Sequence, residues 1–427
     1  MLTRCLSDGT AVWLDPMRDV ASVALGLYML GGSADEGPEA HGSTHFLEHL
    51  LFKRSRRRTG SAIARTTDRL GGDCDAYTTK ETVAFHARTT AARADEALDL
   101  LLDLTEAPAF TADDVELERE VILEEMAEAR DVPEDHLHDT FVRRLWPSHP
   151  LGAPVLGTEE SVKGLSRRIL ARRFREVFRP ERTLIVAAGA FEPGRVIRRL
   201  EAARDRARRR EPGAPSPGPK PGRPASRRCL FDVPRPDLAQ THLLIGAPTI
   251  AWGDPRRAAA SLAVTILGGG VSSRLWRDVR ETRGLAYSVG AGLMLHREAG
   301  LALVEAATHP KNLARLVRTT GRVLARLIAD GVTKAELSRA KHQIEAEIAL
   351  SLESTAARRE AAARAWLVRG RPVPPEELVA EVRAATAADV AEAARLLFGG
   401  LGPVGLAVSG PPVPGVSVED LMEELAA

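Results

Sequence analysis

The segment Gly42-Ser43-Thr44-His45-Phe46-Leu47-Glu48-His49 contains the spacing H-x-x-E-H. In a helix, His45 and His49 lie one turn apart and point to the same side, where one divalent metal ion can contact both imidazoles. Glu48 lies beside that face, and its carboxylate can take a proton from a water molecule at the metal and pass it to a leaving amine. The motif therefore indicates metal-assisted peptide hydrolysis. The alternative is a pair of surface or capping histidines that share a helix face by chance.

A catalytic zinc usually has three protein ligands, and an acidic helix further along the chain can supply the third. Residues 116–130 read ELEREVILEEMAEAR. Carboxylates seven residues apart in this run, such as Glu118 and Glu125, point the same way. One of them would bind the metal and the other would orient a histidine. The alternative is an ordinary acidic helix face. Spacing alone leaves five candidates open: Glu116, Glu118, Glu124, Glu125 and Glu128.

The composition is that of an ordinary globular protein. The chain has 427 residues, of which 44% are hydrophobic and 27% charged, so it can form a large core. Lys plus Arg (59) and Asp plus Glu (58) nearly cancel, and no apolar stretch is long enough to span a bilayer. Cys5, Cys74 and Cys229 are too widely separated to give a disulfide framework or a thiolate zinc site. We therefore expect a cytoplasmic protein with no nucleic-acid partner and no membrane span.

A proline-rich segment divides the chain into near-equal halves. Residues 211–228 read EPGAPSPGPKPGRPASRR, which favours an extended linker over helix or sheet. We expect an N-terminal catalytic half, 1–210, and a C-terminal half, 229–427. Each half mixes β-rich runs with long amphipathic helices. The predicted fold class is therefore α+β, with two similar halves that each pack helices on an antiparallel-rich sheet.

Three further segments give local predictions. Residues 10–14 and 20–27, with a turn at 16–19, are expected to form an N-terminal hairpin. Residues 356–365 are rich in Ala, Arg and Glu and are expected to form a solvated helix. The basic run 53–58 (KRSRRR) is expected to be a solvated loop and not a polyanion site, because it is short and has no interleaved aromatic residue.

Four segments in combination resemble the pitrilysin or insulinase family of inverted zinc proteases, especially compact bacterial members similar to the mitochondrial processing peptidase. They are HFLEHLLFK (45–53), DRLGGDCDAYTTKE (68–81), EREVILEEM (118–126) and HPLGAPVLGTEESV (149–162). The resemblance implies one zinc ion per chain, bound by His45, His49 and Glu125. It also implies that Glu48 is the general base and that Glu118 is a supporting carboxylate.

The same resemblance assigns substrate-binding residues in both halves. Asp75 and Ala76 fall in a strand that pairs with an extended substrate in the family, although Asp75 stands where relatives usually have Asn. This departure predicts a shift in preference toward basic substrate residues. Arg280 and Tyr287 resemble the family's Arg/Tyr pair, whose guanidinium and phenol can donate to a peptide carbonyl and stabilise an oxyanion. Without the resemblance, Arg280 would be interpreted as a solvated residue and Tyr287 as a core aromatic.

The function predicted from the residues and the resemblance together is a zinc-dependent endopeptidase. It would hydrolyse peptides or unfolded precursor segments inside an enclosed chamber. The compact members of the family imply a homodimer in which each zinc site faces the Arg/Tyr half of the other subunit, and two-fold pairing is also the commonest oligomer. Two alternatives are a non-catalytic scaffold or peptide-binding subunit of this fold, and a protease that is active only with a partner chain in peptide maturation.

Overall fold

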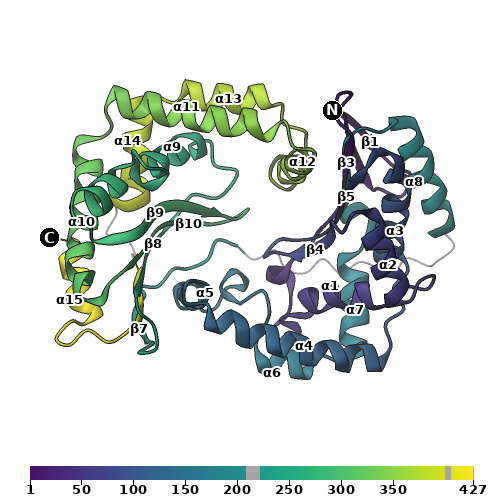
Figure 1. Ribbon diagram of the computed structural model, residues 1–427, viewed down its shortest axis with the longest axis horizontal. Helices are drawn as coiled ribbons and strands as arrows, with labels where there is room; N and C mark the ends of the chain where they lie inside the picture. The colour runs from purple at the N-terminus through teal and green to yellow at the C-terminus, as the bar shows by residue number, and fades with distance from the viewer. Residues whose placement is uncertain (208–221, 400–404, 427) are drawn as a thin grey trace. The chain divides into compact units, whose positions relative to one another are not determined.

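The computed structural model describes residues 1–207, 222–399 and 405–426, and its chain divides into two compact units (Figure 1). The units are not consecutive halves of the chain, because residues 128–152 belong to the second unit and residues 350–373 to the first. Most of the predicted linker, residues 211–221, lies outside the described part. The first unit comprises 1–127, 153–220 and 350–373, and the second comprises 128–152, 221–349 and 374–427.

The first unit is built on a six-stranded sheet with the order β1-β2-β6-β3-β5-β4. Strands β2 and β6 are parallel, and all other neighbours are antiparallel. The strands are β1 (Leu2–Cys5), β2 (Ala11–Pro16), β3 (Ser22–Leu30), β4 (Cys74–Thr78), β5 (Thr82–Thr90) and β6 (Thr183–Gly189).

The predicted N-terminal hairpin is wrong, because β6 lies between β2 and β3. Strand β2 pairs with β1 and β6, and β3 pairs with β6 and β5. Every residue of β6 is buried, as expected for a central strand that is covered on both faces. An apolar strand far along the chain therefore displaces the local turn pairing that the N-terminal sequence favours.

Helices cover both faces of this sheet. On one face Val83 and Phe85 of β5 pack with Leu51 of α1 and Leu101 of α3. On the other face lies α12, where Ala362 and Ala363 pack with Trp13, Tyr28 and Ala84. The helices of this unit are α1 (Ser43–Lys53), α2 (Gly60–Leu70), α3 (Ala94–Glu106), α4 (Ala112–Asp131), α6 (Glu159–Gly164), α7 (Arg167–Val177), α8 (Pro193–Ala207) and α12 (Thr355–Arg369).

The position of α12 corrects the expectation of a solvated helix over residues 356–365. Thr355, Arg359, Ala362 and Ala363 are buried on one face of α12. Small alanine side chains allow a helix to approach a sheet closely, so the composition that favours a solvated helix also suits a covering helix.

The second unit contains a five-stranded sheet with the order β7-β11-β8-β10-β9. Helix α5 covers one face of it, and there Phe141 lies so close to Gly246 and Gly405 that a Cβ at either glycine would be 2.6 or 2.5 Å from the ring. The strands are β7 (Leu230–Pro234), β8 (Thr241–Thr249), β9 (Ala286–Leu295), β10 (Gly300–Thr308) and β11 (Gly405–Gly410). The helices are α5 (Pro133–Leu145), α9 (Arg257–Gly268), α10 (Leu313–Asp330), α11 (Lys334–Ser351), α13 (Pro375–Ala384), α14 (Ala387–Ala394) and α15 (Val418–Ala426).

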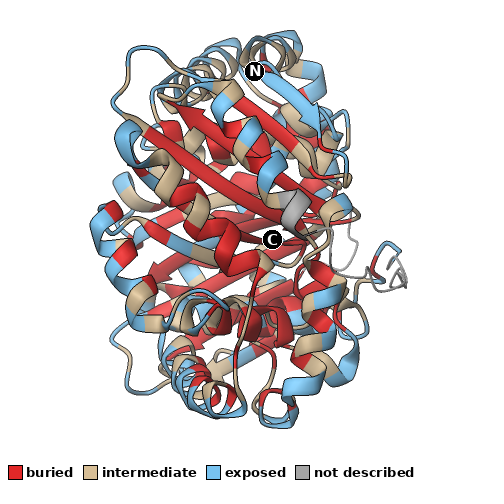
Figure 2. Cartoon of the chain, turned by 90° about the vertical axis from the view of Figure 1, so that its right-hand side faces the viewer, coloured by how far each residue is buried: buried red, intermediate tan, exposed pale blue. Residues whose placement is uncertain are grey.

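The two sheets have the same pattern of parallel and antiparallel strand pairing, which confirms the predicted α+β class with two similar halves. In each, a parallel pair (β2 with β6, β7 with β11) is followed by three antiparallel pairings. Strands β4 and β9 therefore occupy the same edge position in their sheets. Figure 2 shows the strands largely buried and the exposed residues concentrated on the helices. Within the described ranges, no helix has the length and apolarity that a bilayer crossing needs.

Candidate metal centre

Helix α1 carries the H-x-x-E-H motif, and buried charges hold its first turn. Gly42 precedes the helix with φ of 84°, a left-handed conformation that favours glycine. The Glu36 carboxylate accepts hydrogen bonds from the backbone N–H groups of Gly42 (2.7 Å) and Thr44 (2.6 Å), which have no partner within the helix. Arg173 donates to Thr44 Oγ1 (2.9 Å) and to the Gly32 carbonyl (2.8 Å). Together these contacts fix the position of the turn that contains His45.

His45, His49 and Glu125, the three residues that the family resemblance implies, lie close together. His45 Nε2 lies 3.6 Å from Glu125 Oε1, and His49 Nε2 lies 3.4 Å from Glu125 Oε2. The two imidazole rings are 4.7 Å apart between centroids, and their planes are inclined at 65°. One donor atom from each residue can be chosen so that all three lie within 4.8 Å of one another. The structure therefore brings together two nitrogen donors from α1 and a carboxylate from α4.

These spacings fit a tetrahedral zinc site. Donors at about 2.0–2.2 Å from a tetrahedral zinc are about 3.3–3.6 Å from each other. Each histidine nitrogen lies at such a separation from one oxygen of Glu125, His45 Nε2 from Oε1 and His49 Nε2 from Oε2. The buried Oε2 of Glu125 meets no donor in hydrogen-bond geometry among the described residues, although His49 Nε2 is near. Nitrogen and carboxylate donors of this kind are ligands that zinc accepts. The three residues could thus hold the ion that the resemblance implies.

Glu118 supports His49 from the side opposite Glu125. Its Oε2 lies 3.2 Å from His49 Nδ1, and Lys53 Nζ contacts its Oε1. The Glu118 side chain is only 3% exposed, so these two partners compensate a charge that burial would otherwise disfavour. Because Glu118 occupies Nδ1, it leaves His49 Nε2 directed at Glu125, which is the orientation that a metal ligand needs.

The protonation states of the site follow from burial and charge. Burial lowers the pKa of His45 to about 4 despite the nearby Glu125, so this imidazole is neutral at pH 7. Burial also acts to lower the pKa of His49, but the contacts with Glu118 and Glu125 and the charges of Glu125 and Glu48 outweigh it and raise that pKa to about 9. The contact with His49 keeps the pKa of Glu125 below its usual value. In the metal-free chain a proton on His49 therefore balances the carboxylates, and metal binding would release it.

Glu48 projects from α1 toward strand β4. Burial raises the pKa of its carboxyl group, and a hydrogen bond from Thr78 opposes this rise. Thr78 Oγ1 donates to Glu48 Oε2 over 2.6 Å. A general base benefits from a pKa above that of a solvated carboxylate, because its proton affinity then approaches the working pH.

Asp75 and Ala76 lie on β4, which is the edge strand of the first sheet. The Ala76 N–H donates to Oδ1 of Asp75 over 2.8 Å. Asp75 is exposed, and Ala76 packs against the core on the face of the sheet that α1 and α3 cover. The edge position agrees with pairing to an extended peptide, although the Asp75 carboxylate holds the Ala76 amide that such a peptide would contact.

Arg280 and Tyr287 lie in the second unit, on either side of the turn between a short π-helix (Trp276–Glu281) and β9. The Arg280 guanidinium carbon lies 4.0 Å from the centre of the Trp276 ring and 4.7 Å from that of Tyr287. Tyr287 is 75% exposed, so the alternative of a core aromatic is wrong. The three side chains line part of a pocket of about 430 Å³ together with Glu134 and His242, which are 3.1 Å apart.

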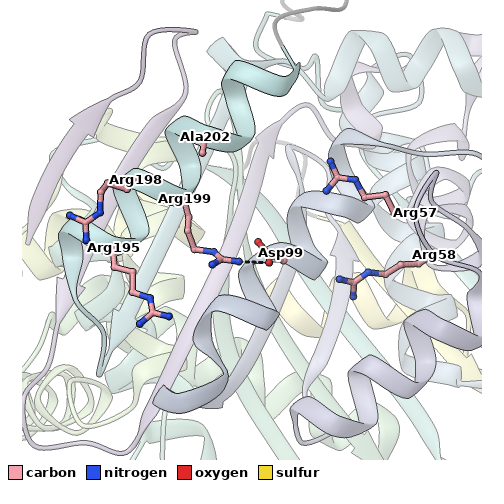
Figure 3. Close-up of a pocket in the computed structure, with 7 residues that line it drawn as sticks. All are labelled: Arg57, Arg58, Asp99, Arg195, Arg198, Arg199 and Ala202. Carbon is pink, nitrogen blue, oxygen red and sulfur yellow. Dashed lines mark hydrogen bonds and ion pairs between the residues drawn. The ribbon is translucent and has the colours of Figure 1, made fainter.

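The basic run 53–58 is only partly the solvated loop that was expected. Ser55 is buried and donates to Asp103 over 2.6 Å, and Lys53 contacts Glu118. Other members of the run line a pocket of about 400 Å³ (Figure 3), whose walls are Arg57, Arg58, Asp99, Arg195, Arg198, Arg199 and Ala202. The guanidinium groups there are paired with carboxylates, namely those of Asp95, Asp99, Asp103 and Glu192. The charge of this pocket is therefore largely balanced.

Three residues of the site were not predicted from the sequence. Glu36 and Arg173 fix the start of α1, and Thr78 contacts Glu48. Thr78 lies two residues beyond Ala76, on the same face of β4, so the alternation of a strand offered a signal for it. Glu36 and Arg173 come from loop and helix positions with no local pattern that marks them.

Two family models match most of the chain. Residues 15–159 match the family model described as insulinase (peptidase family M16), and residues 164–344 match the model described as peptidase M16 inactive domain. A Mycobacterium tuberculosis (strain H37Rv) protein named as an uncharacterized zinc protease is 37% identical over 395 residues, which cover 92% of this chain and 90% of the relative. A Bacillus subtilis (strain 168) protein, also named as an uncharacterized zinc protease, is 31% identical and covers 92% and 94%.

Solved structures share the fold. A protease from Helicobacter pylori superposes with a TM-score of 0.88 at 18% identity and covers 96% of this chain and 99% of its own. A structure described as a peptidase M16 inactive domain from Pseudomonas fluorescens gives a TM-score of 0.85 at 23% identity and covers 96% and 98%. The similarity extends along nearly the whole chain, so it includes both units.

Proposed function

The chain belongs to the insulinase family of peptidases, family M16, and from that premise we propose that it is a zinc-dependent endopeptidase. The metal ligands in this proposal are His45, His49 and Glu125, with one zinc ion per chain. The observation that carries it is the proximity of one donor atom from each of these residues, all within 4.8 Å of one another, with each histidine nitrogen 3.4 or 3.6 Å from an oxygen of Glu125. The names of the two bacterial relatives support a zinc protease.

Glu48 is the general base of the proposed reaction. A zinc ion at the three ligands would lower the pKa of a water molecule toward about 7 and polarise the peptide carbonyl. Glu48 accepts the proton that the attacking water loses and transfers it to the amine nitrogen as the C–N bond breaks. Glu118 holds His49 in the tautomer and orientation that binding requires, through the contact of 3.2 Å with Nδ1.

The remaining predicted residues would hold the peptide. In the proposal, Arg280 and Tyr287 donate to the substrate carbonyl and stabilise the negative charge that develops on its oxygen. The exposure of Tyr287 and its contact with the Arg280 guanidinium support this role. The edge strand β4, with Asp75 and Ala76, would bind the extended peptide by main-chain pairing.

The proposal also includes a homodimer that encloses the substrate and a cytoplasmic location. Its support is the resemblance to compact members of the family and the low cysteine content. Light scattering of the purified protein tests the dimer, which should have twice the 46.1 kDa mass of one chain. A mass equal to one chain at working concentration would contradict it.

Hydrolysis of a quenched peptide by the purified chain tests the catalytic role. The parent enzyme should cleave the peptide, lose activity with a chelator and regain it with zinc. Glu48→Gln should keep its zinc but lose at least about 100-fold in kcat, since general-base catalysis contributes about 10²–10⁴-fold. Glu124→Gln is the matched control, because Glu124 is exposed on α4 beside the ligand Glu125. Undiminished hydrolysis by Glu48→Gln would overturn the assigned role, and zinc-free activity of the parent would overturn the metal requirement.

A further inference from the structure

We propose that Thr78 is a positioning residue for Glu48, and that Glu360 on α12 anchors the strand that carries Thr78. The inference rests on the proposed function, because it concerns the residue assigned there as the general base. It gives a role to two positions, Thr78 and Glu360, to which neither the motif nor the family resemblance assigns one. It also gives a role to α12, the helix that the C-terminal part of the chain contributes to the first unit.

The contact between Thr78 and Glu48 is direct and short. Thr78 Oγ1 donates to Glu48 Oε2 over 2.6 Å, which is the length of a charge-assisted O–H···O⁻ hydrogen bond. Glu48 is on α1 and Thr78 is at the last position of β4, so the bond joins the motif helix to the sheet edge. A carboxylate that accepts this bond through one oxygen keeps its other oxygen free to receive a proton.

Strand β4 needs an anchor, because it is an edge strand of five residues with one neighbour, β5. The adjacent residue Tyr77 supplies that anchor on the opposite face of the sheet. Its hydroxyl donates to Glu360 Oε2 over 2.8 Å. Consecutive residues of β4 thus donate hydrogen bonds on opposite faces of the sheet, Thr78 to Glu48 and Tyr77 to Glu360.

Glu360 is itself fixed by two partners from separate elements. Tyr28 of β3 donates to its Oε1 over 2.9 Å, and the Arg359 guanidinium donates to the same oxygen over 2.7 Å. Tyr28 and Arg359 are 2% and 4% exposed and the Glu360 side chain is 32% exposed, so the cluster is partly buried where α12 packs on the sheet (Figure 1). The absence of a side chain at Gly26 leaves space for the Tyr28 ring, since a Cβ at Gly26 would be 2.6 Å from that ring.

The arrangement predicts how the loss of either hydrogen bond affects kcat. Loss of the Tyr77 hydroxyl would remove the hydrogen bond that joins β4 to Glu360 on α12. Thr78 could then move away from Glu48. A misplacement of about 1 Å can cost about 100-fold in rate, so even a partial shift of the base should be visible in kcat. The metal ligands belong to α1 and α4, and zinc content should therefore be unaffected.

The first experiment compares two substitutions at Thr78 in the full-length zinc enzyme. Thr78→Val keeps the shape of the side chain and removes the hydroxyl, and we expect kcat to fall about 10- to 100-fold with KM within about 3-fold. Thr78→Ser restores the hydroxyl and should return kcat to within about 3-fold of the parent. Equal losses in both variants would overturn the positioning role, because only packing would then explain them.

The second experiment uses a matched pair of tyrosines. Tyr77→Phe and Tyr28→Phe each delete one hydroxyl that donates to Glu360, but only Tyr77 lies on the strand that carries Thr78. Tyr77→Phe should lower kcat about 5- to 10-fold and Tyr28→Phe less than about 2-fold, with similar zinc content. In the Thr78→Val background, Tyr77→Phe should have no further effect, because Tyr77 acts through Thr78. Equal effects of the two tyrosine variants, or full additivity with Thr78→Val, would overturn the inference.

A measurement on the metal-free chain separates this inference from the proposed function. Amide hydrogen exchange of residues 74–79 should be faster in Tyr77→Phe than in the parent and unchanged in Tyr28→Phe. If Glu48→Gln abolishes hydrolysis but Tyr77→Phe and Tyr28→Phe behave alike, the proposed function stands and the inference falls. If Glu48→Gln remains fully active, both fall, since Glu48 is then not the base.

Discussion

Replacement of Glu118 by Gln should weaken zinc binding without unfolding α4. The Glu118 side chain is 3% exposed, its Oε2 lies 3.2 Å from His49 Nδ1, and its Oε1 contacts Lys53. Hydrogen bonds to charged groups contribute about 1.5–3 kcal/mol, which corresponds to about 10- to 150-fold in affinity at 1.4 kcal/mol per tenfold. Loss of an outer carboxylate–histidine contact typically costs about 10- to 100-fold in metal affinity. This range agrees with the range obtained from the hydrogen-bond energy.

The assay is competition between the protein and a zinc chelator of known affinity, followed by the absorbance of the chelator complex. Glu120→Gln is the matched control, because Glu120 is exposed on the same helix. Glu118→Gln should bind zinc about 10- to 100-fold more weakly, and Glu120→Gln should bind within about 2-fold of the parent. An affinity of Glu118→Gln equal to that of the control would refute the reasoning that Glu118 orients His49.

Three further predictions test other parts of the account. Glu36→Gln should lower the free energy of unfolding by about 3 kcal/mol in urea titrations, because it weakens a helix cap and removes one of the negative charges that act on the buried Arg173 guanidinium. A loss below about 1 kcal/mol would contradict this. Hydrogen bonds from Arg274 keep the pKa of Glu336 at about 2, below its usual 4.5, so this carboxylate stabilises the fold fully above pH 4.5 and less as the pH falls toward 2. Glu336→Gln should therefore cost about 1–2 kcal/mol at pH 7 and less at pH 3.5, and a cost independent of pH would speak against the ion pair. Asp75→Asn should reduce the ratio of kcat/KM for matched basic and acidic peptides by about 2- to 5-fold, the effect of one exposed charge, whereas an unchanged ratio would remove Asp75 from substrate selection.

The local parts of the site could be predicted from the sequence. The spacing of His45 and His49 needs only the periodicity of one helix, and α1 spans Ser43–Lys53 as that spacing requires. Glu118 and Glu125 are two turns apart on α4, and both face α1. Spacing alone left five glutamates open, and the resemblance selected two of them. The structure places those two beside the histidines, while the catalytic and metal-binding roles of these residues stay predictions.

The long-range parts could not be predicted, because they depend on which distant segments pack together. Strand β6 lies between β2 and β3, and no feature of residues 10–27 predicts this insertion. Helix α12 has the composition of a solvated helix, yet it covers the first sheet and contributes Arg359 and Glu360 to a partly buried hydrogen-bonded cluster. The exchange of residues 128–152 and 350–373 between the units likewise cannot be read from local periodicity.

A crystal structure of the zinc-loaded protein, with anomalous scattering recorded on both sides of the zinc absorption edge, tests the central claim most directly. We predict one zinc peak per chain, about 2.0–2.2 Å from His45 Nε2, His49 Nε2 and an oxygen of Glu125. A chain with no peak at this position, or with a zinc ion that Glu125 does not contact, would contradict the proposed metal centre.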